Sequence, residues 1–300
     1  MTKLGNTDLD VYGLNLGGNV FGWTADEETS FAVLDAYAAA GGNFVDTADV
    51  YGGGGGSEEI LGRWVAARGN RDNVVIATKV GAWDARPGLS AKNIQAAAED
   101  SLRRLNTDHI DLYYAHRDDR DTPLEETLEA FDALVRAGKV RYLGASNYTA
   151  DRLAEALSIS DKNGLARYAV LQPHYNLVER DYERDLAPLV DREGLATLPY
   201  FALAKGFLTG KYRSKDETGD SPRAARAVSY LDGGGERVLA ALDEVAAAHG
   251  VSVATVALAW LRVQPTVAAP IASARTPEQL TDLIASVSLS LTPDEEASLS

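Results

Sequence analysis

The residues of this chain that could do chemistry begin with an acid and a tyrosine in one stretch, NFVDTADVYGGGGGSE, at residues 43–58. Phe44 and Val45 form a short apolar run that ends at the carboxylate of Asp46, and Tyr51 follows just before five glycines. An apolar run, an acid and then a loop are typical of the carboxyl end of a buried parallel strand, where α/β barrels and doubly wound sheets place their active sites. Taken alone, the same residues also fit a helix cap followed by a surface turn, which is the commoner use of such residues.

Polar residues also close other apolar runs of the chain. If these runs are parallel strands of one barrel, the residues that follow them all lie on the same rim. Each one has a structural explanation of its own, as a strand terminus, a buried histidine or a helix cap. Seven such residues or pairs at one end are harder to explain in that way: Asp46, Lys79, His116, Ser146 with Asn147, Gln172, Tyr200 and the segment from Ser273 to Arg275.

An ammonium, a carboxylate, an imidazole and a phenol in one cleft can move a proton to or from a carbonyl oxygen. A phenol has a pKa near ~10, so it needs a neighbouring cation to act as an acid or base near neutral pH. Lys79 would be that cation, and Asp46 would pair with it and hold it in place. A neutral His116 would donate a hydrogen bond to the developing alkoxide, and Tyr51 would deliver the proton.

The order of the elements that must position these residues predicts a single (β/α)₈ barrel, an α/β fold, over residues 1–300. Residues 3–14 alternate apolar and polar, which predicts a β-hairpin that caps the barrel over residues 1–14. Residues 211–236 are rich in charge, glycine and serine, interrupt the alternation before the eighth strand, and fit either a surface loop or a lid. Eight short apolar runs read as strands that alternate with helical segments, at residues 14–18, 44–46, 74–78, 110–115, 140–145, 169–171, 196–199 and 267–269.

Composition narrows the class of protein. The 300 residues carry a net charge of −15, which opposes a broad nucleic-acid or anionic-membrane surface and leaves an anionic ligand to a local basic patch. The chain has no cysteine and four scattered histidines, so disulfides, thiolate chemistry and a zinc cluster are not expected. It has no apolar run long enough for a membrane span and no signal peptide, so we expect a soluble, cytoplasmic protein. Nothing in the sequence indicates an oligomeric state.

Asp46, Tyr51, Lys79 and His116, in the contexts VDTADVYG, IATKVG and DLYYAHRDD, resemble the catalytic tetrad of the aldo-keto reductase superfamily. The resemblance covers nearly the whole chain, from LGNTDLDVYGLNLGG near the start to ARTPEQL near the end. It implies a TIM barrel that binds NADPH in an extended pose at the carboxyl face and transfers hydride between NADPH and an aldehyde or ketone, with Tyr51 as general acid. It implies no Rossmann domain, and the glycines here form no G-x-G-x-x-G between a strand and a helix.

The resemblance also implies a set of cofactor-binding residues. Ser146, Asn147 and Gln172 resemble the residues that hydrogen-bond the nicotinamide carboxamide, and Tyr200 resembles the tyrosine that stacks on the ring. The motif ALAKGFLTGKY looks like the pyrophosphate-binding loop, with Leu203, Lys205, Gly206 and Leu208. In IASARTPEQL, the residues Ser273, Arg275 and Gln279 resemble the segment that holds the adenosine end, where Arg275 could pair with a 2′-phosphate.

Three positions depart from the family pattern. Phe201 and Ala202 stand where many relatives have Ser-Pro, which puts one hydroxyl contact to the pyrophosphate in doubt. Leu283 stands where an asparagine often contacts the adenine. The glycine run at residues 52–56 is longer than usual, which predicts a mobile rim. Since Ser273 carries no charge, a preference for NADPH would depend on Arg275, and NADH is a second candidate cofactor.

The sequence does not choose the substrate, and two other activities stay open. Trp23, Trp83 and Tyr51 would line the cleft with aromatic faces, which suits apolar and sugar-like carbonyl compounds alike. One alternative is a regulatory subunit that binds a nicotinamide cofactor, as in the potassium-channel β subunits that resemble this superfamily. The other is a lyase with a Schiff base on Lys79, which the neighbouring charge of Asp46 disfavours.

Overall fold

The computed structural model describes residues 1–216 and 224–299, and its centre is a parallel sheet of eight strands. Every strand pair in this sheet is parallel, in the order β11-β10-β9-β8-β5-β4-β3-β12. The strands are β3 (Asn15–Gly17), β4 (Phe44–Asp46), β5 (Val75–Val80), β8 (Ile110–Ala115), β9 (Val140–Ser146), β10 (Tyr168–Gln172), β11 (Ala196–Thr197) and β12 (Ile271–Ala272).

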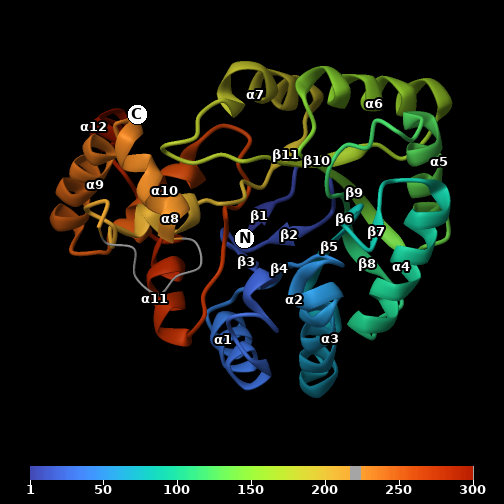
Figure 1. Ribbon diagram of the computed structural model, residues 1–300, viewed down its shortest axis with the longest axis horizontal. Coiled ribbons are helices and arrows are strands. Elements are labelled where there is room, and N and C mark those ends of the chain that lie inside the picture. Colours follow the sequence, from blue (N-terminus) through green and yellow to red (C-terminus); the bar gives the residue numbers. More distant parts are fainter. Residues whose placement is uncertain (217–223, 300) are drawn as a thin grey trace.

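Helices follow most of the strands and surround the sheet (Figure 1). They are α1 (Glu27–Ala39), α2 (Tyr51–Gly54), α3 (Gly56–Arg68), α4 (Ala91–Leu105), α5 (Leu124–Arg136), α6 (Ala150–Asn163), α7 (Tyr182–Glu193), α8 (Ala224–Val228), α9 (Gly235–His249), α10 (Val253–Val263), α11 (Pro277–Ala285) and α12 (Pro293–Leu299). Short 3₁₀ helices are η1 (Gly18–Val20), η2 (Arg71–Asn73), η3 (Ala204–Thr209) and η4 (Ser229–Gly233). The predicted (β/α)₈ barrel is confirmed.

The sheet closes on itself between β11 and the segment that leads into β12. The backbone N–H of Ala268 donates to Thr197 O at 3.0 Å, and that of Ile271 donates to Pro199 O at 2.9 Å. The eighth strand was expected at residues 267–269, but the segment that pairs with β3 is β12, at residues 271–272. Thr266 has a φ of 67° and Pro270 has no N–H to donate, so residues 267–269 cannot continue as a regular strand.

The core has two parts, as a closed barrel requires. Tyr114, Val170 and Leu112 belong to the inner cluster, whereas Tyr113 and Leu171 pack between the sheet and the helices. Neighbouring residues therefore face opposite sides of a sheet that is buried on both, which is why its strands are continuous apolar runs.

The predicted amino-terminal hairpin is present as β1 (Thr2–Lys3) paired with β2 (Asp10–Val11) in antiparallel fashion. Its side chains Leu4, Leu9 and Val11 join the inner cluster, so the hairpin covers one end of the barrel. A second hairpin, β6 (Ala82–Trp83) with β7 (Arg86–Pro87), follows β5 and was not expected.

The role of the segment 211–236, as a surface loop or a lid, stays a prediction. Residues 217–223 of that segment lie outside the described residues, and residues 224–233 form α8 and η4. Within the described ranges, no single helix is long and apolar enough to cross a membrane. The consecutive helices α9 and α10 together have the length and composition of a membrane span, but they are bent by 99° relative to each other.

Candidate active site

A buried ion pair joins neighbouring strands at the carboxyl end of the sheet. Lys79 is on β5 and Asp46 closes β4; the two side chains are 0% and 4% exposed. Lys79 Nζ donates to Asp46 Oδ1 and to Thr47 O, the latter at 2.7 Å. Burial lowers the pKa of Lys79, but the charge of Asp46 and the interaction with Tyr51 outweigh it and leave this pKa above its ordinary value. The amine therefore stays protonated at neutral pH, which makes it a poor nucleophile for a Schiff base.

The loop after β4 continues the hydrogen-bond ladder with β5 and so brings Tyr51 to this pair. The N–H of Thr47 donates to Ala77 O at 2.8 Å, and that of Asp49 donates to Lys79 O at 3.2 Å. Lys79 Nζ lies 5.1 Å from the centroid of the Tyr51 ring. The ammonium is thus placed where it stabilises the phenolate over the phenol.

His116 completes the group from the end of β8. Its backbone N–H donates to Val80 O at 2.9 Å, and its ring meets Tyr51 edge to face with centroids 5.9 Å apart. Burial, with the charges of Lys79 and Arg117, holds the pKa of His116 well below its usual value. The imidazole is therefore neutral at pH 7 and can donate a hydrogen bond without carrying charge. The structure brings all four predicted catalytic residues together.

Three predicted nicotinamide contacts form one hydrogen-bonded wall beside the tetrad. Gln172 Nε2 donates to Asp46 Oδ2 at 2.9 Å, and Ser146 Oγ donates to Gln172 O at 2.9 Å. Asn147, in the left-handed region with a φ of 58°, donates from Nδ2 to His116 O at 2.9 Å. Tyr200 OH then donates to Asn147 Oδ1 at 2.7 Å. This wall is held in place from several strands, as a site for a flat polar ring requires.

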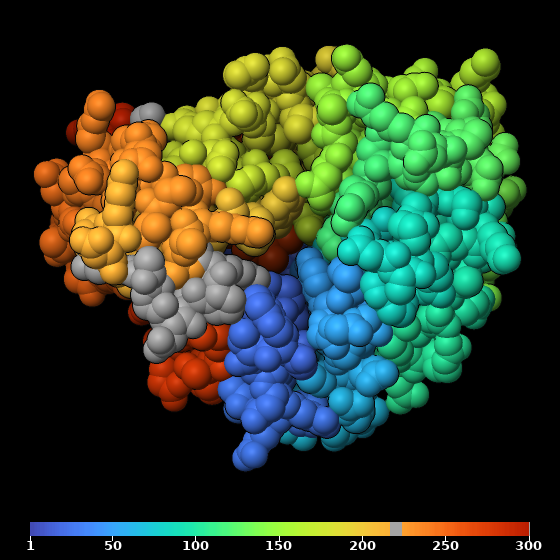
Figure 2. Space-filling model, viewed as in Figure 1, coloured from blue at the N-terminus to red at the C-terminus, as the bar shows by residue number. Residues whose placement is uncertain are grey.

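A cavity of about 590 Å³ runs from the tetrad along the carboxyl face. Figure 2 shows this face hollowed at its centre. Eleven of the predicted binding residues line the cavity together with Asp46, Tyr51 and His116: Ser146, Asn147, Gln172, Tyr200, Leu203, Lys205, Gly206, Ser273, Arg275, Gln279 and Trp23. Lys79 is buried behind the wall and is not among the lining residues.

The segment from Phe201 to Gly206 adopts a strained backbone over part of this cavity. Phe201, Ala204 and Lys205 have φ values of 50°, 47° and 59°, in the left-handed region that non-glycine residues avoid. Lys205 Nζ donates to Tyr230 OH at 3.0 Å and lies 5.5 Å from the Phe201 ring centroid. Strain of this kind persists where the surroundings impose it, and it collects at ligand sites.

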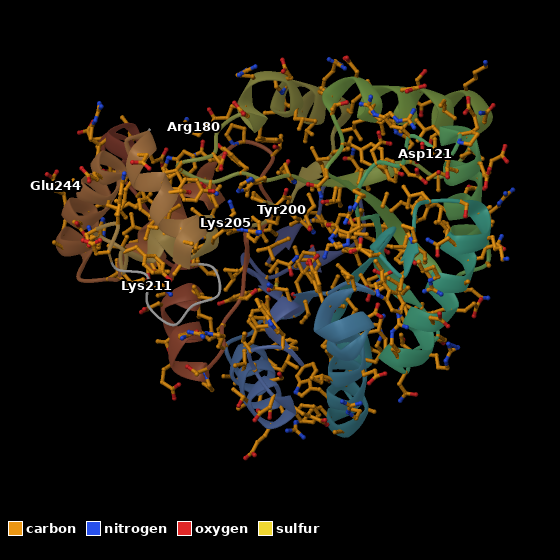
Figure 3. All side chains as sticks on the ribbon, in the orientation of Figure 1. Asp121, Arg180, Tyr200, Lys205, Lys211 and Glu244 are labelled. Atoms are coloured by element: carbon orange, nitrogen blue, oxygen red, sulfur yellow. The ribbon has the colours of Figure 1, made fainter. Side chains whose placement is uncertain are left out.

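Further cavity residues escaped the sequence analysis. Lys211 lines the cavity beyond Lys205, and in Figure 3 Tyr200, Lys205 and Lys211 follow one another outward from the centre of the view. Asn19, in η1, also lines it and contacts Ser273, whose Oγ lies 2.5 Å from Asn19 Oδ1. Lys211 is the second lysine of the motif ALAKGFLTGKY, six residues after Lys205, and this repetition could have indicated that it lines the cavity too.

Two predicted contacts do not reach the cavity. Leu208 is buried in the outer core, and its N–H donates to Leu203 O at 3.2 Å. The ring of Trp83, on β6, lies so close to Gly54 that a Cβ added to Gly54 would be 2.6 Å from it. On the same ring, the Arg86 guanidinium lies 5.6 Å from the centroid. Trp83 thus packs on the glycine run after Tyr51. Leu283, the departure at the adenine position, does line the cavity.

The segment predicted to hold the adenosine end is held by hydrogen bonds between its own backbone and side chains. The N–H of Arg275 donates to Gln279 Oε1 at 3.0 Å, and Thr276 caps α11 by accepting from the Gln279 N–H. Arg275 lines the cavity, as Lys211 does. Among the described residues, no group of three or more His, Asp or Glu side chains could hold a metal ion.

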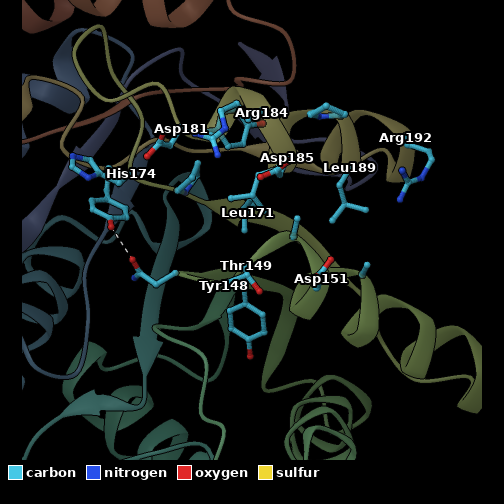
Figure 4. A pocket seen from close by; sticks show the side chains of 18 residues that line it. Tyr148, Thr149, Asp151, Leu171, His174, Asp181, Arg184, Asp185, Leu189 and Arg192 are labelled. Carbon is cyan, nitrogen blue, oxygen red and sulfur yellow. Dashed lines mark hydrogen bonds and ion pairs between the residues drawn. The ribbon is translucent and has the colours of Figure 1, made fainter.

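A second cavity, of about 830 Å³, lies between α6 and α7 (Figure 4). Arg184, Asp185 and Arg192 line its α7 side, and Thr149 and Asp151 its α6 side. It shares Asn147 and Tyr200 with the first cavity, so the hydrogen bond between these two side chains stands between the two spaces.

Residues 13–300 match the aldo/keto reductase family. The chain belongs to that family. It is 39% identical to the uncharacterized oxidoreductase YrpG of Bacillus subtilis (strain 168), covering 97% of this chain and 91% of the relative. It is 37% identical to the norsolorinic acid reductase stcV of Emericella nidulans, covering 96% and 77%. It is 34% identical to the aryl-alcohol dehydrogenase [NADP(+)] of Phanerodontia chrysosporium, covering 91% and 75%. This aldo/keto reductase is an oxidoreductase that acts with a nicotinamide cofactor on a small carbonyl compound or its alcohol.

Proposed function

We propose that this aldo/keto reductase uses NADPH to reduce an aldehyde or ketone, with Tyr51 as the proton donor. The observation that carries the proposal is the fully buried Lys79, paired with Asp46 and lying 5.1 Å from the Tyr51 ring, behind the wall of a cavity that Tyr51 and His116 line.

The chain's own residues divide the work of proton transfer. The Lys79 ammonium stabilises negative charge on the Tyr51 oxygen and so lowers the barrier to giving up its proton. Asp46 holds the ammonium in place. The neutral His116 donates a hydrogen bond to the carbonyl oxygen as negative charge develops there. Substrate orientation depends on Tyr51, His116 and Trp23, which is 54% exposed at the cavity.

The cavity fits an extended dinucleotide. Ser146, Asn147 and Gln172 offer amide and hydroxyl groups near the tetrad, and Tyr200 offers an aromatic face. Lys205 and Lys211 offer positive charge further out (Figure 3), and Arg275 adds a guanidinium to the lining. This order of groups matches a nicotinamide at one end and phosphates at the other. The bound cofactor would supply the hydride. A 2′-phosphate would find a guanidinium at Arg275 or an ammonium at Lys211, which favours NADPH over NADH.

The test is a panel of aldehydes, ketones and oxidised sugars, with NADPH and NADH in parallel and the loss of reduced-cofactor absorbance as the readout. An aryl aldehyde heads the panel because one relative is named for aryl alcohols and because Trp23 offers an exposed aromatic face. Turnover of at least one carbonyl that Tyr51→Phe abolishes supports the proposal. Tight cofactor binding without turnover of any substrate would instead favour a regulatory subunit.

A further inference from the structure

A buried carboxylate close to the tetrad has no part in the proposed reaction. Asp49 is 0% exposed, and both of its carboxylate oxygens lack a hydrogen-bond partner within the described part of the chain. An ionised carboxylate in such a place costs several kcal/mol unless other groups compensate it. Asp49 therefore needs an explanation.

The backbone of Asp49 ties it to the catalytic residues. It lies two residues before Tyr51, and its N–H donates to Lys79 O at 3.2 Å. The loop in which it stands has no regular secondary structure of its own and depends on such contacts with β5. Whatever holds the Asp49 side chain therefore also holds the loop that carries Tyr51.

Charged groups on four neighbouring elements act on the side chain of Asp49. The charges that act on it from neighbouring elements are Glu58 on α3, Lys79 on β5, Arg86 on β7 and Arg104 on α4, and Asp49 in turn acts on Tyr113 of β8. We call Asp49, Glu58, Arg86, Arg104 and Tyr113 the rear cluster. Tyr113 packs in the outer core, and Thr78, next to Lys79, donates to Glu58 Oε1 at 2.5 Å.

Two members of the rear cluster, Arg104 and Glu58, form hydrogen bonds with each other, whereas the other three keep polar atoms without a partner among the described residues. Arg104 Nε donates to Glu58 Oε2 at 2.7 Å, and these side chains are 14% and 0% exposed. Arg86 Nη1 donates to Asp100 Oδ2 at 2.6 Å. The Nε and Nη2 atoms of Arg86 and the Tyr113 OH are buried without a hydrogen-bond partner among the described residues. Unmatched donors on Arg86 and unmatched acceptors on Asp49 are complementary, and a buried water that bridges such groups is the usual solution.

The charge state of Asp49 is balanced within this cluster. Burial and the negative charge of Glu58 raise the pKa of Asp49 to about 7, against the opposing effect of Arg86, Arg104 and Lys79. Both forms of the carboxyl group are therefore populated near neutral pH, and each interacts differently with the Arg86 donors.

We propose that Asp49 is a positioning residue for Tyr51, and that it holds the loop before Tyr51 against β5 through water-bridged hydrogen bonds to Arg86. The bridge links this loop to the β6–β7 hairpin, whose Trp83 also packs on Gly54 just after Tyr51. The loop is thus held on both sides of the tyrosine. A displacement of Tyr51 from Lys79 by a fraction of an ångström lowers the rate of proton transfer without removing either group.

The kinetic test rests on the proposed function and uses a double-mutant cycle. Asp49→Ala and Arg86→Met should each lower kcat about tenfold, with cofactor affinity within about twofold of the parent, and the double variant should be no slower than either single variant.

Asp49→Asn keeps the shape of the side chain and should retain kcat within about threefold while losing the parent's change of kcat around pH 7. Asp100→Asn, which removes the other partner of Arg86, is the matched control and should stay within about twofold. Multiplicative losses in the double variant, or an unchanged pH profile in Asp49→Asn, would overturn the proposal.

A second measurement needs no turnover. With tyrosine labelled at ¹³Cζ, the NMR resonance of Tyr51 is identified by its disappearance in Tyr51→Phe. It should shift in Asp49→Ala and in Arg86→Met and stay in place in Asp100→Asn. If the parent reduces no carbonyl but Tyr51 shifts in this pattern, the proposed function fails and the positioning role stands. If Tyr51 does not move in Asp49→Ala, the positioning role is wrong whatever the activity.

Discussion

At the scale of single residues, the proposed chemistry depends on how a cation, a phenol and an imidazole are held near the ends of three strands. Lys79 is buried and paired, so its charge is fixed next to Tyr51. His116 is half-buried and has no carboxylate partner among the described residues, so it is neutral. The two environments differ because β4 supplies an acid to Lys79, whereas His116 meets the positive charges of Lys79 and Arg117.

Tyr51→Phe removes the proposed acid and keeps the ring. We expect kcat for carbonyl reduction to fall at least ~100-fold, the scale for a positioned general acid, with NADPH affinity nearly unchanged because the ring stays in place. Steady-state kinetics and a fluorescence titration with NADPH measure the two quantities. Near-parental turnover in this variant would show that another group donates the proton.

Lys79→Met should lower kcat by a similar factor of about 100, because it removes the charge that stabilises the phenolate. It also leaves Asp46 buried without its cation, so the free energy of unfolding should fall by about 3–5 kcal/mol. Asp46→Asn in the same background restores a neutral neighbour and should recover part of the stability and none of the activity. Denaturant unfolding of both variants measures this; recovery of activity would argue against the role of the ammonium.

Arg275→Ala tests the choice of cofactor. A guanidinium–phosphate pair contributes about 1.5–3 kcal/mol, so NADPH binding should weaken roughly tenfold to hundredfold and NADH binding should barely change. Lys211→Ala is the matched comparison, since Lys211 lines the same cavity. Fluorescence titrations with both cofactors decide between them. A loss for NADPH only in Lys211→Ala would transfer the phosphate contact to Lys211, and equal losses for NADPH and NADH in both variants would make NADH the leading candidate.

At the scale of elements, the glycine run after Tyr51 forms a tight turn into α3. Gly52, Gly53, Gly54 and Gly55 all have positive φ. A Cβ on Gly52 would come within 2.7 Å of the Ser57 backbone nitrogen, whereas a Cβ on Gly53 would meet nothing within 4 Å. The first glycine is needed for space and conformation, the second for conformation alone.

Gly52→Ala should therefore lower the free energy of unfolding by about 2–4 kcal/mol and reduce kcat, because the turn must open and Tyr51 moves with it. Gly53→Ala should cost about 1 kcal/mol and leave kcat within about twofold, because only its φ is unfavourable. Chemical denaturation and kinetics on the pair give both numbers. Equal effects of the two substitutions would mean that steric contact with α3 does not shape the site.

At the scale of the whole molecule, buried titratable groups make stability depend on pH. The pKa of Asp49 is raised from 3.8 to about 7 on folding, so the folded protein holds this proton more tightly than the unfolded chain does. The resulting stabilisation is fully present below pH 3.8 and is lost as pH rises to about 7. The raised pKa of Asp49 thus makes stability fall as pH rises, whereas paired surface carboxylates with lowered pKa values make stability rise with pH.

Asp49→Asn removes this dependence. We expect the variant to gain up to about 4 kcal/mol in unfolding free energy relative to the parent at pH 8, and little at pH 4. Urea unfolding at several pH values measures the difference, and Asp100→Asn serves as the control at a partly exposed aspartate. A gain that does not grow with pH would mean that Asp49 is ionised in both states.

The barrel and the residues that close several of its strands could be predicted from local patterns in the sequence, whereas most of the cavity lining was predicted from the resemblance to the family. A buried strand of a parallel sheet is a continuous apolar run, and the polar residue that ends it must lie at the rim, so Asp46, Lys79, His116 and Gln172 could be read from single runs. The hairpin before the first strand was visible from its alternation in the same way.

Tertiary structure alone decided the features that depend on what a residue meets from distant parts of the chain. The β6–β7 hairpin turns Trp83 toward the glycine run, although its type and position suited the substrate cleft. The eighth strand begins after Pro270 because pairing with β11 and β3, not apolar character, sets its place. Asp49 looks like any loop aspartate in the sequence. Its burial and the charges that act on it from α3, α4, β5 and β7 arise only in the folded chain, because no local pattern records which residues meet across tens of positions.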